Sequence, residues 1–139
     1  MFKKILFPAD LAERHERALN VAGDLASQTG GEVVLLHVVE TIAGLSMDEE
    51  STFYARLEKK ARANLSRLGE LLQKRGVSWR AQVLLGSRLQ EIVRFASGES
   101  IDLIVLTSPR LNPNDLGTGW GSLSYKISLM CQCPVLLVK

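Results

Sequence analysis

The sequence predicts an α/β fold: a single doubly wound domain with a five-stranded parallel sheet of order 3-2-1-4-5 and helices on both faces. Short apolar runs alternate with segments of helical period along the whole chain, as in repeated β-α units. Most of these runs are apolar throughout, which is typical of strands covered on both faces. The third run alternates in part, which favours an edge strand; its apolar positions are Val77, Trp79, Ala81 and Val83.

The first two strands flank a helix. The segment "KKILFP" is a short buried strand that ends at Pro8. A helix is predicted from about residue 12 to 29, because its apolar residues recur at three- and four-residue steps, and Gly30 follows it as a helix terminator. The β-branched run "EVVLLHVVE", residues 32–40, is the second strand.

The middle of the chain supplies a long helix and the edge strand. Residues 41–51 are predicted to be a loop with an acidic tip. The apolar stripe that follows predicts a helix from about 51 to 75, closed by Gly76. The third strand is "VSWRAQVLL", residues 77–85.

The last third repeats the pattern around one long loop. Ser87 is placed as the N-cap of a third helix. "IDLIVLT", residues 101–107, is the fourth strand, and "PVLLV" near the C-terminus is the fifth. Between them lie an extended loop from Ser108 and a helix predicted from about 120 to 130. A loop of this length inside a compact domain indicates a functional segment, and we expect it to be mobile without a ligand.

Composition narrows the classes of function. The 139 residues are 46% hydrophobic and 23% charged, so the chain, residues 1–139, is expected to fold as one domain. A net charge of +2 gives no case for binding nucleic acid or an anionic membrane. No apolar run approaches a membrane span. Cys131 and Cys133 do not make a disulfide framework, so a cytoplasmic protein is expected.

The predicted strand order locates a ligand site. Ligands of doubly wound sheets bind beyond the carboxyl ends of the strands, where the winding direction reverses. The order 3-2-1-4-5 puts this reversal between the strands that end at Asp10 and at Thr107. The long loop therefore lies beside Asp10 at the predicted crevice.

Several segments, in this order and at these spacings, carry a family resemblance: "KKILFPAD", "LLHVV", "IDLIVLT", "GSLSYKI" and "CPVLLVK". Over its whole length the chain resembles the universal stress protein family. The resemblance implies the fold predicted above, a homodimer, and a role in stress response. It also implies ATP or AMP as a cofactor, because one branch of the family binds ATP through a loop of Gly, two residues, Gly, nine residues and Gly-Ser or Gly-Thr.

This chain departs from that loop pattern. Counting back from Gly121 puts Ser108 and Leu111 where the first two glycines belong, and counting forward from the strand end puts Thr107 and Arg110 there. Side chains at these positions hinder the approach of backbone N–H groups to a phosphate.

The end of the loop keeps the pattern. Gly117, Gly119, Gly121 and Ser122 can form an anion-binding nest at a helix N-terminus, or simply a flexible hinge.

Two further residues are candidates for binding. The resemblance assigns Asp10 to the nucleotide, where a carboxylate suits ribose hydroxyls; alternatively, Asp10 caps the first helix. The resemblance assigns the backbone of Val38 to adenine; alternatively, Val38 belongs only to the core. His37 is expected to be a core histidine and the two cysteines to be buried small hydrophobes. No metal site and no catalytic residue is predicted.

Three functions follow from these residues. The first is a non-enzymatic stress-response homodimer with a degenerate nucleotide-binding loop. The second is an ATP- or AMP-binding switch, and the third, ranked last, is a slow ATP hydrolase, which needs a base and usually a Mg²⁺ ligand. The dimer is expected to form through the final strand, because "PVLLV" is an uncharged apolar edge.

Overall fold

The computed structural model describes residues 1–11, 14–44, 47–108 and 122–139. Its five strands form one sheet in the order β3-β2-β1-β4-β5, and every neighbouring pair is parallel. The predicted fold class and strand order are therefore confirmed. The strands are β1 (Lys4–Pro8), β2 (Glu32–Glu40), β3 (Ser78–Gly86), β4 (Leu103–Thr107) and β5 (Val135–Val138).

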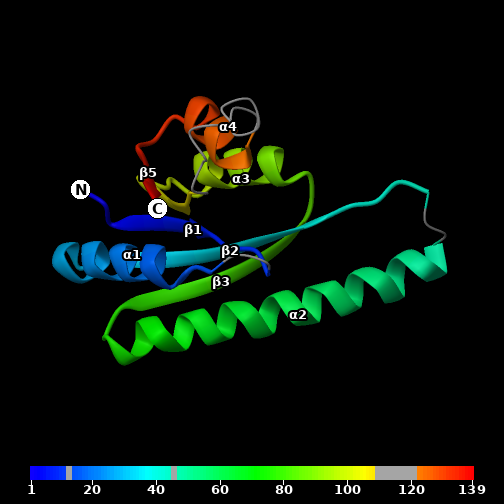
Figure 1. The fold of residues 1–139 in the computed structure, drawn as a ribbon, viewed down its shortest axis with the longest axis horizontal. Helices are drawn as coiled ribbons and strands as arrows, with labels where there is room; N and C mark the ends of the chain where they lie inside the picture. Colours follow the sequence, from blue (N-terminus) through cyan, green and yellow to red (C-terminus); the bar gives the residue numbers. More distant parts are fainter. Residues whose placement is uncertain (12–13, 45–46, 109–121) are drawn as a thin grey trace, which may run out of the picture.

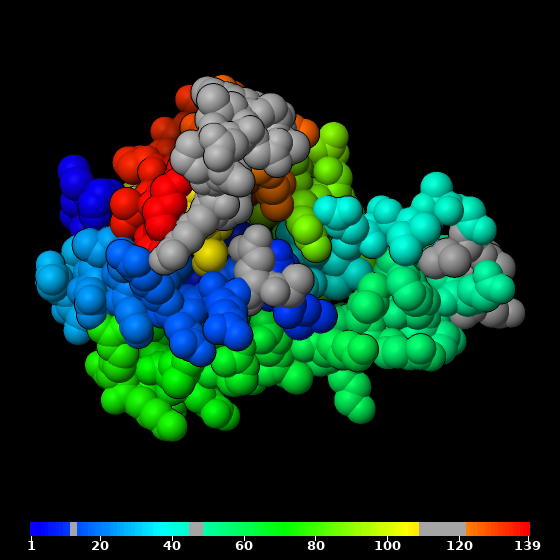
Figure 2. Space-filling model, viewed as in Figure 1, coloured from blue at the N-terminus to red at the C-terminus, as the bar shows by residue number. Residues whose placement is uncertain are grey.

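The helices form a layer on each face of the sheet. Figure 1 shows α1 (Glu16–Thr29) and α2 (Met47–Lys74) on one face, and α3 (Arg88–Gly98) and α4 (Leu123–Met130) on the other. Two apolar cores result, because each layer packs against its own face of the sheet. The N-terminal half of α2, together with residues 41–44 after β2, extends beyond the end of the sheet (Figures 1 and 2).

The central strand β1 joins the two cores. Side chains alternate between the faces of a strand, so Ile5 and Phe7 pack on the α1–α2 side and Leu6 packs on the α3–α4 side. All three are fully buried, and each contributes about 1.5–3 kcal/mol of transfer free energy. This burial explains why the run is apolar without alternation and why β1 lies in the middle of the sheet.

Helix starts differ from those predicted. α1 begins at Glu16, with His15 as its N-cap residue at φ −105° and ψ 0°, so Asp10 is not the cap of this helix. α2 begins at Met47 and takes in the acidic residues that we assigned to a loop; carboxylates suit the first turn of a helix because they oppose the helix dipole. α4 begins at Leu123, and its N-cap is Ser122.

The edge strand β3 is largely half-exposed, as its alternation suggests. Cys131 and Cys133 are half-buried rather than buried, and both pack against the α3–α4 core. Most of the long loop, with Gly117, Gly119 and Gly121, lies outside the described residues. Within the described ranges, no helix is both long and apolar enough to cross a membrane.

Candidate functional site

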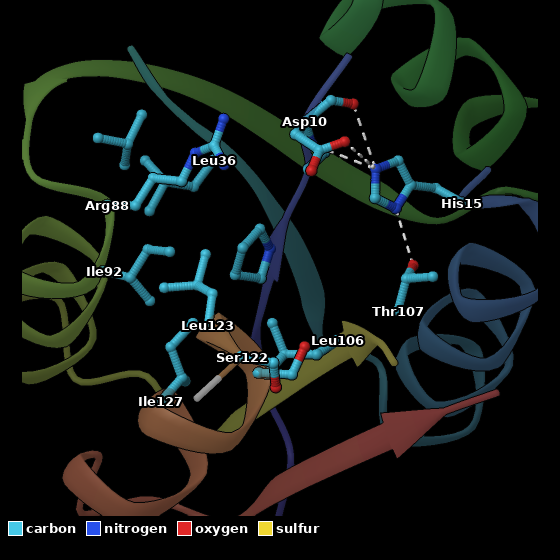
Figure 3. A pocket seen from close by; sticks show the side chains of 14 residues that line it. Asp10, His15, Leu36, Arg88, Ile92, Leu106, Thr107, Ser122, Leu123 and Ile127 are labelled. Atoms are coloured by element: carbon cyan, nitrogen blue, oxygen red, sulfur yellow. Dashed lines mark hydrogen bonds and ion pairs between the residues drawn. The ribbon is translucent and has the colours of Figure 1, made fainter. Parts of the chain in front are cut away.

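A pocket of about 140 Å³ lies at the predicted reversal of the sheet. It opens beyond the carboxyl ends of β1 and β4 and is bounded by β2, α3 and the start of α4 (Figure 3). Its position follows from the strand order, because neighbouring connections leave the sheet here in opposite directions. The lining residues are Pro8, Ala9, Asp10, His15, Leu36, Val38, Arg88, Ile92, Leu106, Thr107, Ser122, Leu123, Ser124 and Ile127.

One end of the pocket is polar. Asp10 follows β1, and its side chain is 25% exposed. His15 lies beside it, with Nε2 3.2 Å from the backbone N of Asp10 and 3.7 Å from its Oδ1. The other ring nitrogen, Nδ1, lies 2.8 Å from the hydroxyl of Thr107 at the end of β4. One imidazole therefore joins the ends of the two strands between which the sheet reverses.

His15 is held firmly in this position. The residue is only 5% exposed, and its ring meets that of Phe7 edge to face, with centroids 5.5 Å apart. The N-cap location fixes its backbone at the start of α1. A ring so enclosed has little freedom to turn away from Asp10 and Thr107.

The opposite end of the pocket is mostly apolar. Leu36 and Ile92 form part of its wall, and Arg88 lies on the same side, across the pocket from His15 and Thr107 (Figure 3). The Nε of Arg88 is 3.4 Å from the carboxylate of Glu40. Both side chains are at least 40% exposed, so this ion pair contributes at most about 1 kcal/mol.

The backbone of Val38 faces this apolar end. The carbonyl of Leu36 accepts a hydrogen bond from the N–H of Ala9, at 2.8 Å. Backbone groups two residues apart along a strand point to the same side, so the N–H and C=O of Val38 also face the β1 side. There β1 has already ended, at Pro8, and Val38 lines the pocket. This places a backbone donor and acceptor at the apolar wall. The side chain of Val38 packs in the α3–α4 core.

The start of α4 contributes hydroxyl groups. The Oγ of Ser122 accepts a hydrogen bond from the N–H of Tyr125, at 3.3 Å, and so caps the helix. Ser122 and Ser124 both line the pocket. The first turn of a helix carries N–H groups without intrahelical partners, which favour an anion.

Ser108 lies apart from the other predicted site residues. It is buried, its backbone N–H donates to the carbonyl of Val138 at 2.7 Å, and its hydroxyl accepts from Nζ of Lys139 at 3.3 Å. It is not among the described residues that line the pocket. The structure thus brings together Asp10, Val38 and Ser122, while Gly117, Gly119 and Gly121 fall outside the described residues.

His37 contacts the backbone of the residue that precedes Asp10. Its Nδ1 lies 2.9 Å from the carbonyl oxygen of Ala9, and the residue is 7% exposed, as expected of a core histidine. Burial lowers the pKa of His37, and Arg88 lowers it further, against the opposing effects of the Ala9 hydrogen bond and Asp10. The neutral imidazole is therefore the favoured form.

The remaining nucleophilic and metal-binding candidates lie elsewhere. Burial raises the pKa of the Cys131 and Cys133 thiols, which disfavours the thiolate form that reacts. No group of three or more His, Cys, Asp or Glu residues in the described part of the chain is arranged to hold a metal ion.

His15 and Arg88 are among the pocket residues that were not predicted as site residues. His15 follows Asp10 by five residues, but no periodicity shows that its ring turns back toward the strand ends. Arg88 directly follows the N-cap Ser87, and a residue at the start of a helix after a sheet strand is a signal that could have indicated it.

Comparison with known proteins gives a consistent result. The sequence model of the universal stress protein family matches residues 1–139. The chain is 28% identical to universal stress protein MJ0577 of Methanocaldococcus jannaschii, over 100% of this chain and 96% of that one. It is 32% identical to a universal stress protein of Thermus aquaticus, over 100% of both.

Solved structures agree in fold. The structure of MJ0577 superimposes with a TM-score of 0.84 at 29% identity, covering 100% of this chain and 96% of that one. A universal stress protein from Archaeoglobus fulgidus gives a TM-score of 0.78 at 21% identity, with 100% of both chains covered. A structure of the universal stress protein from Archaeoglobus fulgidus in complex with dAMP gives a TM-score of 0.74 at 21% identity.

Proposed function

The chain belongs to the universal stress protein family, and we propose that it is a non-enzymatic stress-response protein that binds an adenine nucleotide mainly through its nucleoside half. The dAMP complex of an Archaeoglobus fulgidus relative is consistent with this ligand class. At 21% identity, however, that likeness concerns the fold, so the proposal depends on the residues of the pocket itself.

The backbone of Val38 is the observation that carries the proposal. Adenine presents an amino donor next to a ring-nitrogen acceptor, and the outward N–H and C=O of one strand residue match that pair. Apolar side chains on the same wall, Leu36 and Ile92, suit the faces of a planar base, as in ligand sites that are mostly apolar with a few placed polar groups. The base is accordingly assigned to this end.

Asp10 suits the ribose. Its carboxylate can accept hydrogen bonds from two hydroxyl groups, and it lies at the polar end of the same pocket. A base at Val38 and a sugar at Asp10 direct the 5′ substituent toward Ser122 and Ser124 at the start of α4, where the helix dipole favours an α-phosphate.

The β- and γ-phosphates lack comparable support. The sequence has no glycine at Ser108 or Leu111, and Pro109 has no backbone N–H to donate. We therefore expect ATP to bind little better than AMP. This difference in support between the α-phosphate and the two outer phosphates distinguishes the proposed function from a full ATP-dependent switch.

Hydrolysis of ATP is the less favoured function. It requires a group that orients water and, as a rule, carboxylates on Mg²⁺. Among the described residues that line the pocket, Asp10 is the only acid, and the proposal assigns it to the sugar.

Titration calorimetry with adenosine, AMP and ATP tests the proposed function. The expected order is AMP tighter than adenosine by several-fold, with ATP within about threefold of AMP. Binding of ATP tenfold or more tighter than AMP, which is about 1.4 kcal/mol, contradicts the assignment of weak outer phosphates. Absence of binding for all three contradicts the proposed function.

We also propose a homodimer through β5, which ends the strand order. Figure 2 shows this strand, in red, at the surface beside α1. Leu136 and Leu137 are 37% and 38% exposed, an apolar edge that soluble proteins ordinarily cover. Antiparallel pairing of two β5 strands about a two-fold axis would satisfy the open edge of both.

A further inference from the structure

His15 is the residue of the pocket whose contacts are most fully defined. Its Nδ1 is 2.8 Å from the hydroxyl of Thr107, and its Nε2 is 3.2 Å from both the backbone N and the carbonyl oxygen of Asp10. A neutral imidazole carries one donor and one acceptor nitrogen. With Nδ1–H donating to Thr107, Nε2 accepts the N–H of Asp10; with Nε2–H donating to the Asp10 carbonyl oxygen, Nδ1 accepts from the Thr107 hydroxyl. Each tautomer joins the backbone of Asp10 to Thr107.

These contacts hold the backbone of Asp10 in place. The residue follows the end of β1, where the strand ladder no longer fixes the backbone. The imidazole contacts its backbone from one side, and Asn64 of α2 donates to its carbonyl oxygen, at 3.4 Å, from another. The backbone from which the Asp10 carboxylate extends is therefore held by groups that come from other elements.

Thr107 connects this arrangement to the altered phosphate loop. When positions are counted forward from the strand end, Thr107 stands where the ATP-binding pattern has its first glycine. Glycine has no hydroxyl group to hold an imidazole. The departure from the pattern thus coincides with a contact in which β4 supplies the hydroxyl group that orients His15.

On these grounds we propose that His15 is a positioning residue for nucleoside binding: anchored by Thr107, it holds Asp10 so that the Asp10 carboxylate receives the ribose hydroxyls. The inference rests on the proposed function, because it concerns the sugar of the same nucleotide. It goes beyond that function by assigning the recognition of ribose to a pair, His15 and Thr107, that does not itself contact the sugar.

The test measures preference for the ribose hydroxyls. The affinities of AMP and 2′,3′-dideoxy-AMP are compared by calorimetry in the wild type and in two variants. In His15→Gln the side-chain amide reaches the Nε2 position and can accept from the Asp10 N–H. In His15→Asn it reaches only the Nδ1 position, toward Thr107.

The wild type is expected to prefer AMP over the dideoxy compound by about tenfold or more, and His15→Gln, which keeps a group at the Nε2 position but loses the Thr107 contact, is expected to keep part of this preference. His15→Asn is expected to lose most of this preference, while its affinity for dideoxy-AMP stays within about twofold of the wild-type value. If His15 had a purely structural role, its replacement would weaken the binding of both ligands by a similar factor. Retention of the preference in His15→Asn, or its loss in both variants alike, overturns the inference.

A second pair keeps the test decisive if His15→Asn does not fold. Thr107→Val removes the anchoring hydroxyl with nearly unchanged volume, and Thr107→Ser keeps the hydroxyl. The preference is expected to fall in Thr107→Val and to persist in Thr107→Ser; equal preference in the two overturns the inference. If the wild type binds neither nucleotide, the proposed function itself has failed. If it binds AMP but shows no preference, only the assigned recognition of ribose has failed.

Discussion

The Nδ1 of His37 lies 2.9 Å from the carbonyl oxygen of Ala9, which directly precedes Asp10. The contact joins the middle of β2 to the residue after β1, and Ala9 lines the pocket. Because burial is the largest effect on its pKa and lowers it, His37 donates to Ala9 as a neutral imidazole, and a proton added to it must be accommodated inside the core.

Acid is therefore expected to destabilise the protein through His37. The folded-state pKa of this group lies below its ordinary value of 6.5, so the unfolded chain binds more protons near that pH. Stability then rises with pH up to about 6.5 and levels off above it, and it is lost as the pH falls below 6.5. His37→Asn keeps an amide donor near the Nδ1 position but does not titrate.

Urea unfolding between about pH 5 and pH 7.5 measures this effect. The wild type is expected to lose more stability on acidification than His37→Asn does, because the carboxylates common to both contribute equally. The same pH dependence for the two proteins would show that His37 is not the group responsible.

The substitution Asp10→Asn should weaken the binding of AMP strongly and the binding of free adenine only slightly. The substitution keeps the shape of the side chain but removes its charge and one acceptor, and hydrogen bonds to charged groups contribute about 1.5–3 kcal/mol. Calorimetry with AMP and with free adenine separates the two ends of the pocket. An unchanged affinity for AMP would remove Asp10 from the site.

The β5 edge gives a prediction about assembly. The carbonyls of Pro134 and Val138 accept from β4, at 3.0 Å from the N of Ile104 and 2.7 Å from that of Ser108. By alternation along the strand, the N–H of Leu136 also faces β4 and that of Leu137 faces the open edge. Leu137→Pro thus removes an outward donor, where proline is tolerated.

Sedimentation equilibrium of Leu137→Pro is expected to show a dimer weakened at least tenfold, with thermal stability of the monomer nearly retained. Leu136→Pro is the contrasting variant, because it removes a donor to β4 and should destabilise the fold itself. A wild type that is monomeric at tens of micromolar, or a Leu137→Pro variant that dimerises unchanged, contradicts the proposed interface.

The sequence was sufficient for the sheet because its core residues are governed by local patterns. Ile5, Leu6 and Phe7 are buried on both faces, and such a run can belong only to an inner strand of a covered sheet. The location of Asp10 followed from topology, since the end of β1 adjoins the reversal. The start of α2 differs from the predicted one because the acidic residues that suggest a loop tip also suit a helix N-terminus.

The finer parts of the site depend on contacts between distant residues. His15 and Thr107 are 92 positions apart, and no periodicity encodes the rotamer that brings them together. The N–H and C=O of Val38 face the pocket because β1 ends before it reaches them in the β1–β2 register. The hydrophobic pattern alone does not define this register. Both the His15–Thr107 contact and the direction of the Val38 backbone depend on how distant parts of the chain are placed relative to one another.

An amide NMR titration with AMP tests the proposed nucleotide site, because it reports both binding and its location. We expect the signals of Asp10, Val38 and Ser122, which line one pocket, to shift together along a single saturating curve. We also expect ATP to move the same signals in a similar concentration range. No shifts with AMP at millimolar concentration, where even a free energy of about −4 kcal/mol gives binding, or shifts confined to residues outside this pocket, would contradict the proposed site.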